Sequence, residues 1–123
     1  MDALELIRRY EKGERNFSGV NLSKVKLIGA YLPGINLWGA DLTGANLAKA
    51  KLWGANLSLA NLAQVNLTRA NISGANFQQA NLRGAKLHYI KYYGANFIDC
   101  IYDTSTKFPR GFDPAEYNMR PFE

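Results

Sequence analysis

An apolar residue returns at every fifth position from Phe17 to Phe97, and this spacing constrains the fold more than any other feature of the chain. The series consists of Phe17, Leu22, Leu27, Leu32, Leu37, Leu42, Leu47, Leu52, Leu57, Leu62, Leu67, Ile72, Phe77, Leu82, Leu87, Tyr92 and Phe97. A small or branched apolar residue stands two positions before each later member, so the written unit is A-N-L-x-G. An internal repeat of this kind has to be interpreted before any helix or strand is assigned.

A period of five fits neither a regular helix nor a regular strand. Five residues turn an α-helix by about 500°, so the apolar side chains would spiral around it. An odd step along a strand sends successive apolar side chains to opposite faces. Both conflicts disappear if each unit is a short extended piece followed by a bend, because the leucines then line the inside of a coil. The repeat therefore predicts an all-β solenoid.

Glycine occupies the bend in nine of the seventeen units, two positions after the apolar residue. This is the third position of a turn, and a type II turn needs a positive φ there, which glycine adopts without steric cost. Four other bends hold Leu59, Gln64, Arg69 or Tyr89 in the same slot. We expect these four bends to form type I or irregular turns.

Seventeen tandem copies of A(D/N)LxG resemble the pentapeptide-repeat family, in particular its small cyanobacterial-type members. The resemblance implies a right-handed quadrilateral β-helix with four pentapeptides in each coil, and the residues at both ends add short helical caps. Two patterns in the sequence agree with a period of twenty. Gly34, Gly54, Gly74 and Gly94 recur at that spacing, and the lysines in the Asn slot, Lys26, Lys51, Lys86 and Lys91, fall on only two of the four faces.

We expect a single domain, with a repeat body of about four coils over residues 15–99 and a cap at each end, because open solenoid ends expose unpaired backbone. Residues 1–14 are the N-terminal cap, in which Asp2 and Glu5 have the spacing of a capping box and Gly13 ends a helix. Residues 100–123 are the C-terminal cap, with a loop over 102–109 and a short helix over about 114–118. The segment TKFPRGFDP resembles the closing segment of cyanobacterial and plastid members, and we expect it to fold over the last coil.

The net charge of +5 is unevenly distributed along the chain. Residues 16–98 carry eight basic residues and one acid, Asp41, which gives +7 for the body and −2 for the two ends together. Some family members mimic DNA and inhibit topoisomerases, which requires a strongly acidic surface, and the basic body argues against that activity. No apolar run approaches the roughly 18 residues of a membrane span, so we expect no membrane association. The single cysteine fits a reducing compartment, which favours a cytoplasmic location.

No residue pattern in the chain points to catalysis. His88 is the only histidine, so a histidine pair for a metal ion is absent from the sequence. Cys100 falls in a small inward slot, where packing is expected rather than nucleophilic chemistry. The glycines stand at bends instead of forming a phosphate-binding cluster, and carboxylates are nearly absent from the repeats. We therefore predict a non-enzymatic protein without catalytic residues, metal or cofactor.

The outward side chains of two adjoining faces form the candidate binding surface. Its residues are Tyr31, Lys49, Lys51, Trp53, Arg69, Lys86, His88, Lys91 and Tyr93, with Lys26 and Tyr89 on the same faces. A basic surface with interleaved aromatic side chains suits an acidic protein or a polyanion, and it would equally serve as a solvated face that aids solubility. Trp38 and Leu59 lie outward on another face, where they could make a second, apolar contact or pack against a neighbouring loop.

The leading functional hypothesis is an interaction scaffold, a short rigid monomeric rod that presents its faces to a protein partner. The alternative is a protein that binds a polyanion or a nucleic acid through the basic and aromatic faces, which predicts an affinity that depends on salt. An enzyme is the third hypothesis, and no motif in the chain speaks for it.

Overall fold

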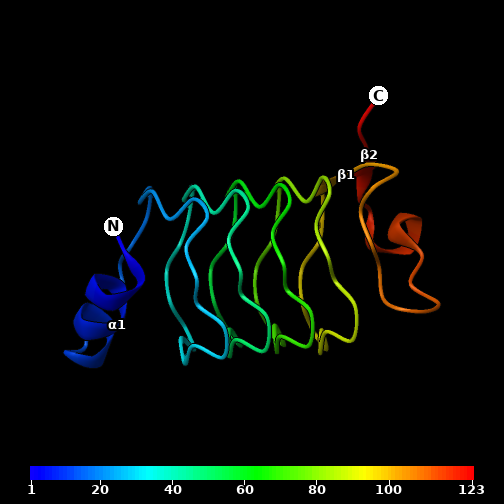
Figure 1. Ribbon diagram of the computed structural model, residues 1–123. Coiled ribbons are helices and arrows are strands. Elements are labelled where there is room, and N and C mark those ends of the chain that lie inside the picture. The colour runs from blue at the N-terminus through cyan, green and yellow to red at the C-terminus, as the bar shows by residue number, and fades with distance from the viewer.

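The chain winds into a four-sided coil, as the computed structural model of all 123 residues shows (Figure 1). Parallel β-bridges join successive coils, and fourteen of the fifteen isolated bridges connect residues that are twenty apart, from Asn16 and Asn36 to Asn81 and Ile101. Each coil therefore uses four five-residue units, one for each side. The expected solenoid with four pentapeptides per coil is confirmed.

Four ladders of hydrogen bonds, one on each face, hold the coils together. We number the faces by their first inward residue: first face Phe17, second face Leu22, third face Leu27 and fourth face Leu32. On the second face the Leu22 N–H donates to the carbonyl of Asp41 at 2.7 Å, and the Asp41 N–H donates back to the carbonyl of Val20 at 2.9 Å. Each inner coil is thus bonded to the coil before it and to the coil after it.

Columns of leucine and alanine fill the inside of the coil. Every fifth residue from Phe17 to Leu87 has at most 2% of its surface exposed, and the alanines two positions before them, from Ala40 to Ala85, are buried beside them. The narrow interior accepts these small side chains, and it leaves no buried side-chain polar atom without a hydrogen-bond partner. Phe77 and Phe97 stack with ring centroids 5.5 Å apart in the first-face column. The interior is therefore a packed apolar core.

The bends without glycine adopt the same backbone as those with it, so the expectation of type I or irregular turns at these positions is wrong. Leu59, Gln64, Arg69 and Tyr89 have φ values of 59°, 59°, 64° and 59°, close to the 64–72° of the bend glycines Gly19 to Gly94. A type I turn has negative φ at this position. The ladder explains the difference, because the N–H of the bend residue must reach the next coil, as Arg69 does when it donates to the His88 carbonyl at 2.9 Å.

Helix α1 (Ala3–Glu11) closes the N-terminal end of the coil (Figure 1). Asp2 is its N-cap and accepts from the Glu5 N–H at 2.8 Å. The expected capping box is only half formed, because the Glu5 carboxylate turns to Arg9 instead of the Asp2 N–H. Leu6 and Tyr10 are the buried residues of the helix and pack on the first coil.

Two groups of the cap donate hydrogen bonds to carbonyl oxygens of the first coil. Inside the body such carbonyls accept from the preceding coil, which the first coil does not have. The Tyr10 hydroxyl donates to the carbonyl of Pro33, and the Met1 ammonium donates to the carbonyl of Asn21 at 3.1 Å. These contacts lie on the fourth and second faces, so the cap is bonded to the coil on two sides. The cap therefore replaces part of the hydrogen bonding that a further coil would supply.

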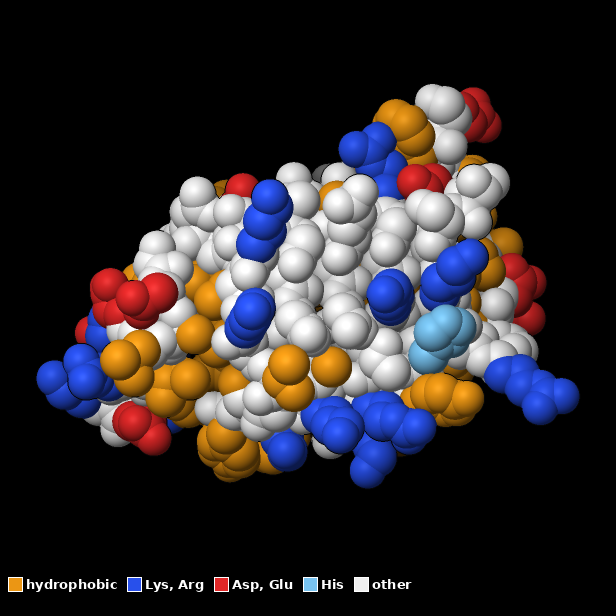
Figure 2. Space-filling model, in the orientation of Figure 1, with side chains coloured by type: hydrophobic (Ala, Val, Ile, Leu, Met, Phe, Trp, Pro, Cys, Tyr) orange, Lys and Arg blue, Asp and Glu red, His pale blue; other side chains and the backbone are white.

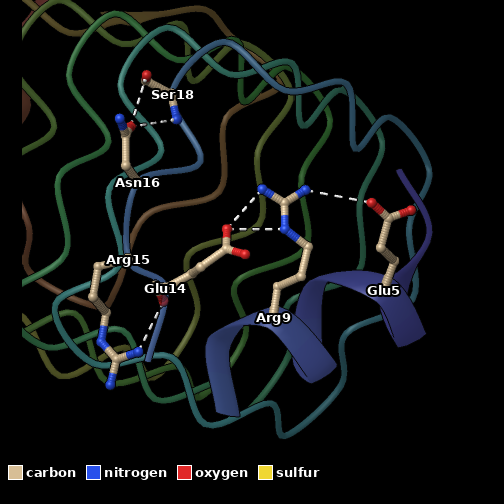
Figure 3. A network of polar contacts seen from close by, with 6 residues as sticks. All are labelled: Glu5, Arg9, Glu14, Arg15, Asn16 and Ser18. Atoms are coloured by element: carbon tan, nitrogen blue, oxygen red, sulfur yellow. Dashed lines mark hydrogen bonds and ion pairs between the residues drawn. The ribbon is translucent and has the colours of Figure 1, made fainter. Parts of the chain in front are cut away.

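An ion-pair network ties α1 to the residues that follow it (Figure 3). The Arg9 guanidinium donates to the Glu14 carboxylate at 2.7 and 2.9 Å and to the Glu5 carboxylate at 3.3 Å. The hydrogen bond from Arg9 lowers the pKa of the Glu14 carboxyl below its ordinary value. Beyond the network, Asn16 accepts from the backbone and hydroxyl of Ser18, which is the first of the repeated Asn turns.

The C-terminal segment continues the coil further than the sequence pattern suggests. Strand β1 (Ile101–Tyr102) pairs in parallel with strand β2 (Arg120–Pro121), and Lys107 still bridges to Lys86 across a step of twenty-one residues. The expected loop over 102–109 is therefore wrong at Tyr102 and Lys107, because one extra residue lets the chain stay in the ladder after the leucine repeat has ended. The short helix is present as the 3-10 helix η1 (Pro114–Tyr117), with Asp113 as its N-cap.

An aromatic cluster closes the C-terminal end of the core. Phe112 stacks on Tyr117 with ring centroids 4.4 Å apart and on Phe108 at 5.0 Å. The same phenylalanine meets Tyr92 and Phe97 edge-on at 5.4 and 5.7 Å. The segment that includes residues 108–112 thus folds over the last coil, as expected from the sequence.

Candidate functional site

All nine candidate binding residues are exposed, and they lie on the adjoining third and fourth faces. Lys49, Arg69, Lys86 and His88 stand on the third face, and Tyr31, Lys51, Trp53, Lys91 and Tyr93 stand on the fourth. We call these nine residues, together with Lys26 and Tyr89 of the same faces, the basic-aromatic surface. Figure 2 shows Lys and Arg side chains, hydrophobic side chains and the histidine close together along the lower part of the body.

Their positions follow from the repeat. Within each unit the Asn slot and the two bend positions point outward, because the alanine and leucine positions point into the core. Lysine replaces asparagine at Lys51, Lys86 and Lys91, so these ammonium groups stand in the row where the other units carry amides. Trp53 and Tyr93 occupy the first bend position of the fourth face, and Arg69 and Tyr89 occupy the second bend position of the third face.

The structure brings several of these side chains into contact. Tyr31 and Trp53 meet edge-on with ring centroids 5.5 Å apart. The Arg69 guanidinium lies over the Tyr89 ring, 4.7 Å from its centroid, and His88 is tilted against the same ring at 6.2 Å. Stacked arginine keeps its charge and its outward N–H donors available, so these contacts position the cation without neutralising it.

The cations of the basic-aromatic surface have no acidic partner. The ion pairs of the chain are Arg9 with Glu5, Arg9 with Glu14, and Arg120 with Asp99, all of them outside this surface. The outward positions of the third and fourth faces hold six basic residues from Lys26 to Lys91 and no Asp or Glu. An uncompensated group of charges of one sign attracts oppositely charged molecules over a distance of about one Debye length.

Two neighbouring features could not be found from the repeat pattern. Lys107 extends the cations of the third face through its bridge to Lys86, but the twenty-one-residue step hides this register in the sequence. At the other end, Ile7, Tyr10, Glu11, Arg15 and Tyr31 line an open hollow of about 430 Å³ between α1 and the fourth face. Arg15 lies over the Tyr10 ring at 3.7 Å and forms one wall of it. The hollow depends on where the cap helix docks, which no repeat position specifies.

The structure offers little reactive chemistry. No group of three or more His, Cys, Asp or Glu side chains lies close enough to hold a metal ion. Cys100 is fully buried, its thiol donates to the carbonyl of Phe77, and burial raises its pKa to about 12. Asp41 and Asp103 accept hydrogen bonds from Thr43 and Ser105, which hold the pKa of each carboxyl below its ordinary value. Each of these groups serves the local structure of a bend or of the core.

Comparison with known proteins identifies the family. A family model described as pentapeptide repeats matches residues 21–58, 40–79 and 60–101 with eight copies. The chain belongs to the pentapeptide-repeat family. Its four-sided coil is the right-handed quadrilateral β-helix of this family, whose members are generally non-catalytic.

Solved pentapeptide-repeat proteins resemble the chain over most of its length. The protein alr5209 from Nostoc PCC 7120 is 30% identical, with 98% of this chain and 96% of that chain covered and a TM-score of 0.53. AT2G44920 from the Arabidopsis thaliana thylakoid lumen is 31% identical, with 76% and 68% covered and a TM-score of 0.55. The search of curated proteins finds no match. None of the helices in the structure is long and apolar enough to cross a membrane.

Proposed function

We propose that this pentapeptide-repeat protein is a non-enzymatic interaction scaffold whose basic-aromatic surface docks an anionic macromolecule. The observation that carries the proposal is the charge distribution: six basic side chains and no carboxylate on two adjoining faces, with none of the six in an ion pair. We place this role in the cytoplasm of a cyanobacterial cell, with the rod acting as a monomer.

Rigidity supports a docking role. Each outward side chain of the inner coils is mounted on a backbone that is hydrogen bonded to both neighbouring coils and backed by a packed core. A surface that is already ordered loses little conformational entropy on binding, so more of the contact energy appears as affinity. The caps on both ends keep the coil from extending, which leaves the faces as the surfaces for a partner.

An acidic protein and a polynucleotide share the chemistry that this surface recognises, namely closely spaced negative charges. Charge and the flatness of the faces alone favour an acidic protein, since a flat face of the rod suits the surface of a folded domain. The exposed aromatic rings between the cations favour a nucleic acid as the second candidate, because bases stack on such rings.

The test compares two charge-matched double variants. Lys51→Gln with Lys91→Gln removes two cations from the surface, and Lys24→Gln with Arg110→Gln removes two exposed cations elsewhere. Binding to poly-L-glutamate and to a (dT)12 oligonucleotide is measured over a series of salt concentrations. We expect the first variant to bind at least one of these probes more weakly and with a smaller salt slope, by about one to two. Equal weakening in both variants, or no binding of either probe by the natural protein, would overturn the proposal.

A further inference from the structure

The fourth face carries an aromatic side chain in every second coil of one row. Trp53, Ser73 and Tyr93 occupy equivalent positions, as shown by the bridges from Lys51 to Asn71 and from Asn71 to Lys91. The Gly54 N–H donates to the Ser73 carbonyl at 2.9 Å, and the Gly74 N–H donates to the Tyr93 carbonyl at 2.8 Å, so the three residues follow one another up the face. We call the surface at Ser73, between these two residues of the row, the Ser73 slot.

The backbone spacing of the row leaves room for one flat ring between Trp53 and Tyr93. Two steps of the ladder separate the backbones of Trp53 and Tyr93 by roughly 10 Å. A ring stacked between two rings needs about 7 Å, twice the stacking distance of about 3.4 Å found along a nucleic acid strand. The remaining space lets the side chains adjust, and Ser73 is too small to fill it. The row therefore leaves room for one planar group.

Both aromatic side chains of the row have exposed surface that a ligand can stack on. Trp53 is 38% exposed, and its partner Tyr31 lies one coil towards the N-terminus, on the side away from Ser73. Tyr93 is 91% exposed, so its ring packs against almost nothing in the protein. Aromatic side chains usually bury much of their surface, and a ring held out in water has apolar area that a ligand can cover.

The residues beneath and beside the slot, namely Ser73, Asn71, Lys51 and Lys91, are polar. The Asn71 side-chain oxygen accepts from the Ser73 N–H at 3.1 Å, and neither the Asn71 amide group nor the Ser73 hydroxyl donates a hydrogen bond within the protein. Lys51 and Lys91 flank Asn71 in the neighbouring row, and neither is in an ion pair. The Ser73 slot thus combines an exposed aromatic side chain on each side, hydrogen-bond donors without a partner in the protein, and two nearby cations.

We propose that the Ser73 slot binds one base of a single-stranded nucleic acid, with the adjacent phosphates at Lys51 and Lys91. The inference rests on the proposed function and names the partner class for the same surface. Each nucleotide of a strand carries a flat ring and a negative charge, which match the aromatic side chains and the lysines respectively. An acidic polypeptide matches the lysines but offers no flat ring to the aromatic side chains. A duplex keeps its bases stacked inside the helix, so it cannot place one in the slot without opening.

The experiment fills the slot without changing the charge. Ser73→Phe adds a third ring to the row, and Ser58→Phe adds one at the same position of the first face, where Trp38 and Ile98 show that large side chains fit. The affinity for fluorescein-labelled (dT)12 is measured by anisotropy, and circular dichroism checks that both variants keep the fold. We expect Ser73→Phe to bind (dT)12 about 5- to 100-fold more weakly, while Ser58→Phe binds like the natural protein.

Two further readouts separate the inference from the proposed function. In a Trp38→Phe background the remaining tryptophan is Trp53, whose emission we expect (dT)12 to quench and poly-L-glutamate to leave unchanged. We also expect (dT)12 to bind more tightly than a duplex of the same length. Equal binding of (dT)12 by both Phe variants, or tighter binding of the duplex or of poly-L-glutamate, would overturn the inference and leave the anionic docking surface in place. No binding of any of these probes would overturn both.

Discussion

The Tyr10 hydroxyl donates a hydrogen bond to the Pro33 carbonyl and so joins the cap helix α1 to the first coil. Tyr10 is also buried in the core cluster, so its hydroxyl and its ring contribute separately to the stability of the fold. We predict that Tyr10→Phe lowers the free energy of unfolding by about 1 kcal/mol, since only the hydrogen bond is lost. Tyr10→Ala should cost about 3–5 kcal/mol, because the ring that covers the first coil is lost as well.

Urea denaturation followed by circular dichroism measures both effects. Tyr93→Phe is the matched control, because that hydroxyl belongs to a ring that is almost fully exposed. We expect no measurable change in this control. If Tyr10→Phe and Tyr10→Ala were equally stable, the ring of Tyr10 would not be packing on the coil.

Leu57 lies at the centre of the body and is fully buried in the first-face column. Replacing it with lysine places an unpaired charge in an apolar interior, which costs more than the marginal stability of a small domain can offset. We predict that Leu57→Lys abolishes cooperative thermal unfolding. Ser58→Lys changes the next residue, which points outward, and should keep a sharp melting transition. A sharp melt for Leu57→Lys would mean that this position faces water.

Leu59 adopts a left-handed backbone with φ of 59° while its side chain is exposed. A left-handed conformation costs a non-glycine residue about 1–2 kcal/mol, whereas glycine loses about 0.5–1 kcal/mol through the entropy of the unfolded chain. We therefore predict that Leu59→Gly raises the free energy of unfolding by about 0.5–1 kcal/mol.

Ala63→Gly is the control for this prediction, because Ala63 stands one position earlier in its bend and has no positive φ. The same substitution there should destabilise by about 0.5–1 kcal/mol. Equal effects of the two changes in urea denaturation would show that the backbone at Leu59 is unstrained.

Cys100 is fully buried, and burial raises its pKa to about 12 from an ordinary value of 9.0. The folded chain therefore favours the thiol over the thiolate, so the stabilising contribution of this group is complete below about pH 9 and is lost as the pH rises towards 12. We predict that iodoacetamide modifies the native protein at pH 8 far more slowly than the unfolded chain. Mass spectrometry of a time course follows the single thiol. Modification at the rate of a free thiol in native buffer would show that the last coil is open.

The sequence predicts the coil well because its signal is repeated seventeen times. Every inward position from Phe17 to Leu87 carries the same chemistry, so a local exception such as Arg69 at a bend cannot change the register. The same regularity explains why the turn prediction failed at Leu59 and Tyr89. The hydrogen bonds between coils outweigh the backbone preference of one residue, and the rules for isolated turns do not include these hydrogen bonds.

The ends of the chain are less predictable because each contact there is made once. The twenty-one-residue step that places Lys107 beside Lys86 has no counterpart elsewhere in the sequence. The partner of the Glu5 carboxylate depends on Arg9, which lies on the next turn of α1 and competes with the Asp2 N–H. The basic-aromatic surface is only partly predictable. The period of the repeat predicts which residues share a face, whereas the contacts of Arg69 with Tyr89 and of Tyr31 with Trp53 could be found only from the structure.

The fold and both proposals require that residues twenty apart stand side by side, and disulfide trapping tests this directly. In a Cys100→Ala background, Ser58→Cys with Gln78→Cys places two cysteines in one row of adjacent coils, about 4.8 Å apart along the ladder and within the range that a disulfide can bridge. Ser58→Cys with Ser73→Cys places them fifteen apart, on different faces. We predict that mild oxidation closes the first pair rapidly and leaves the second pair as free thiols. Closure of both pairs at similar rates, or of the second pair alone, would contradict the four-sided coil.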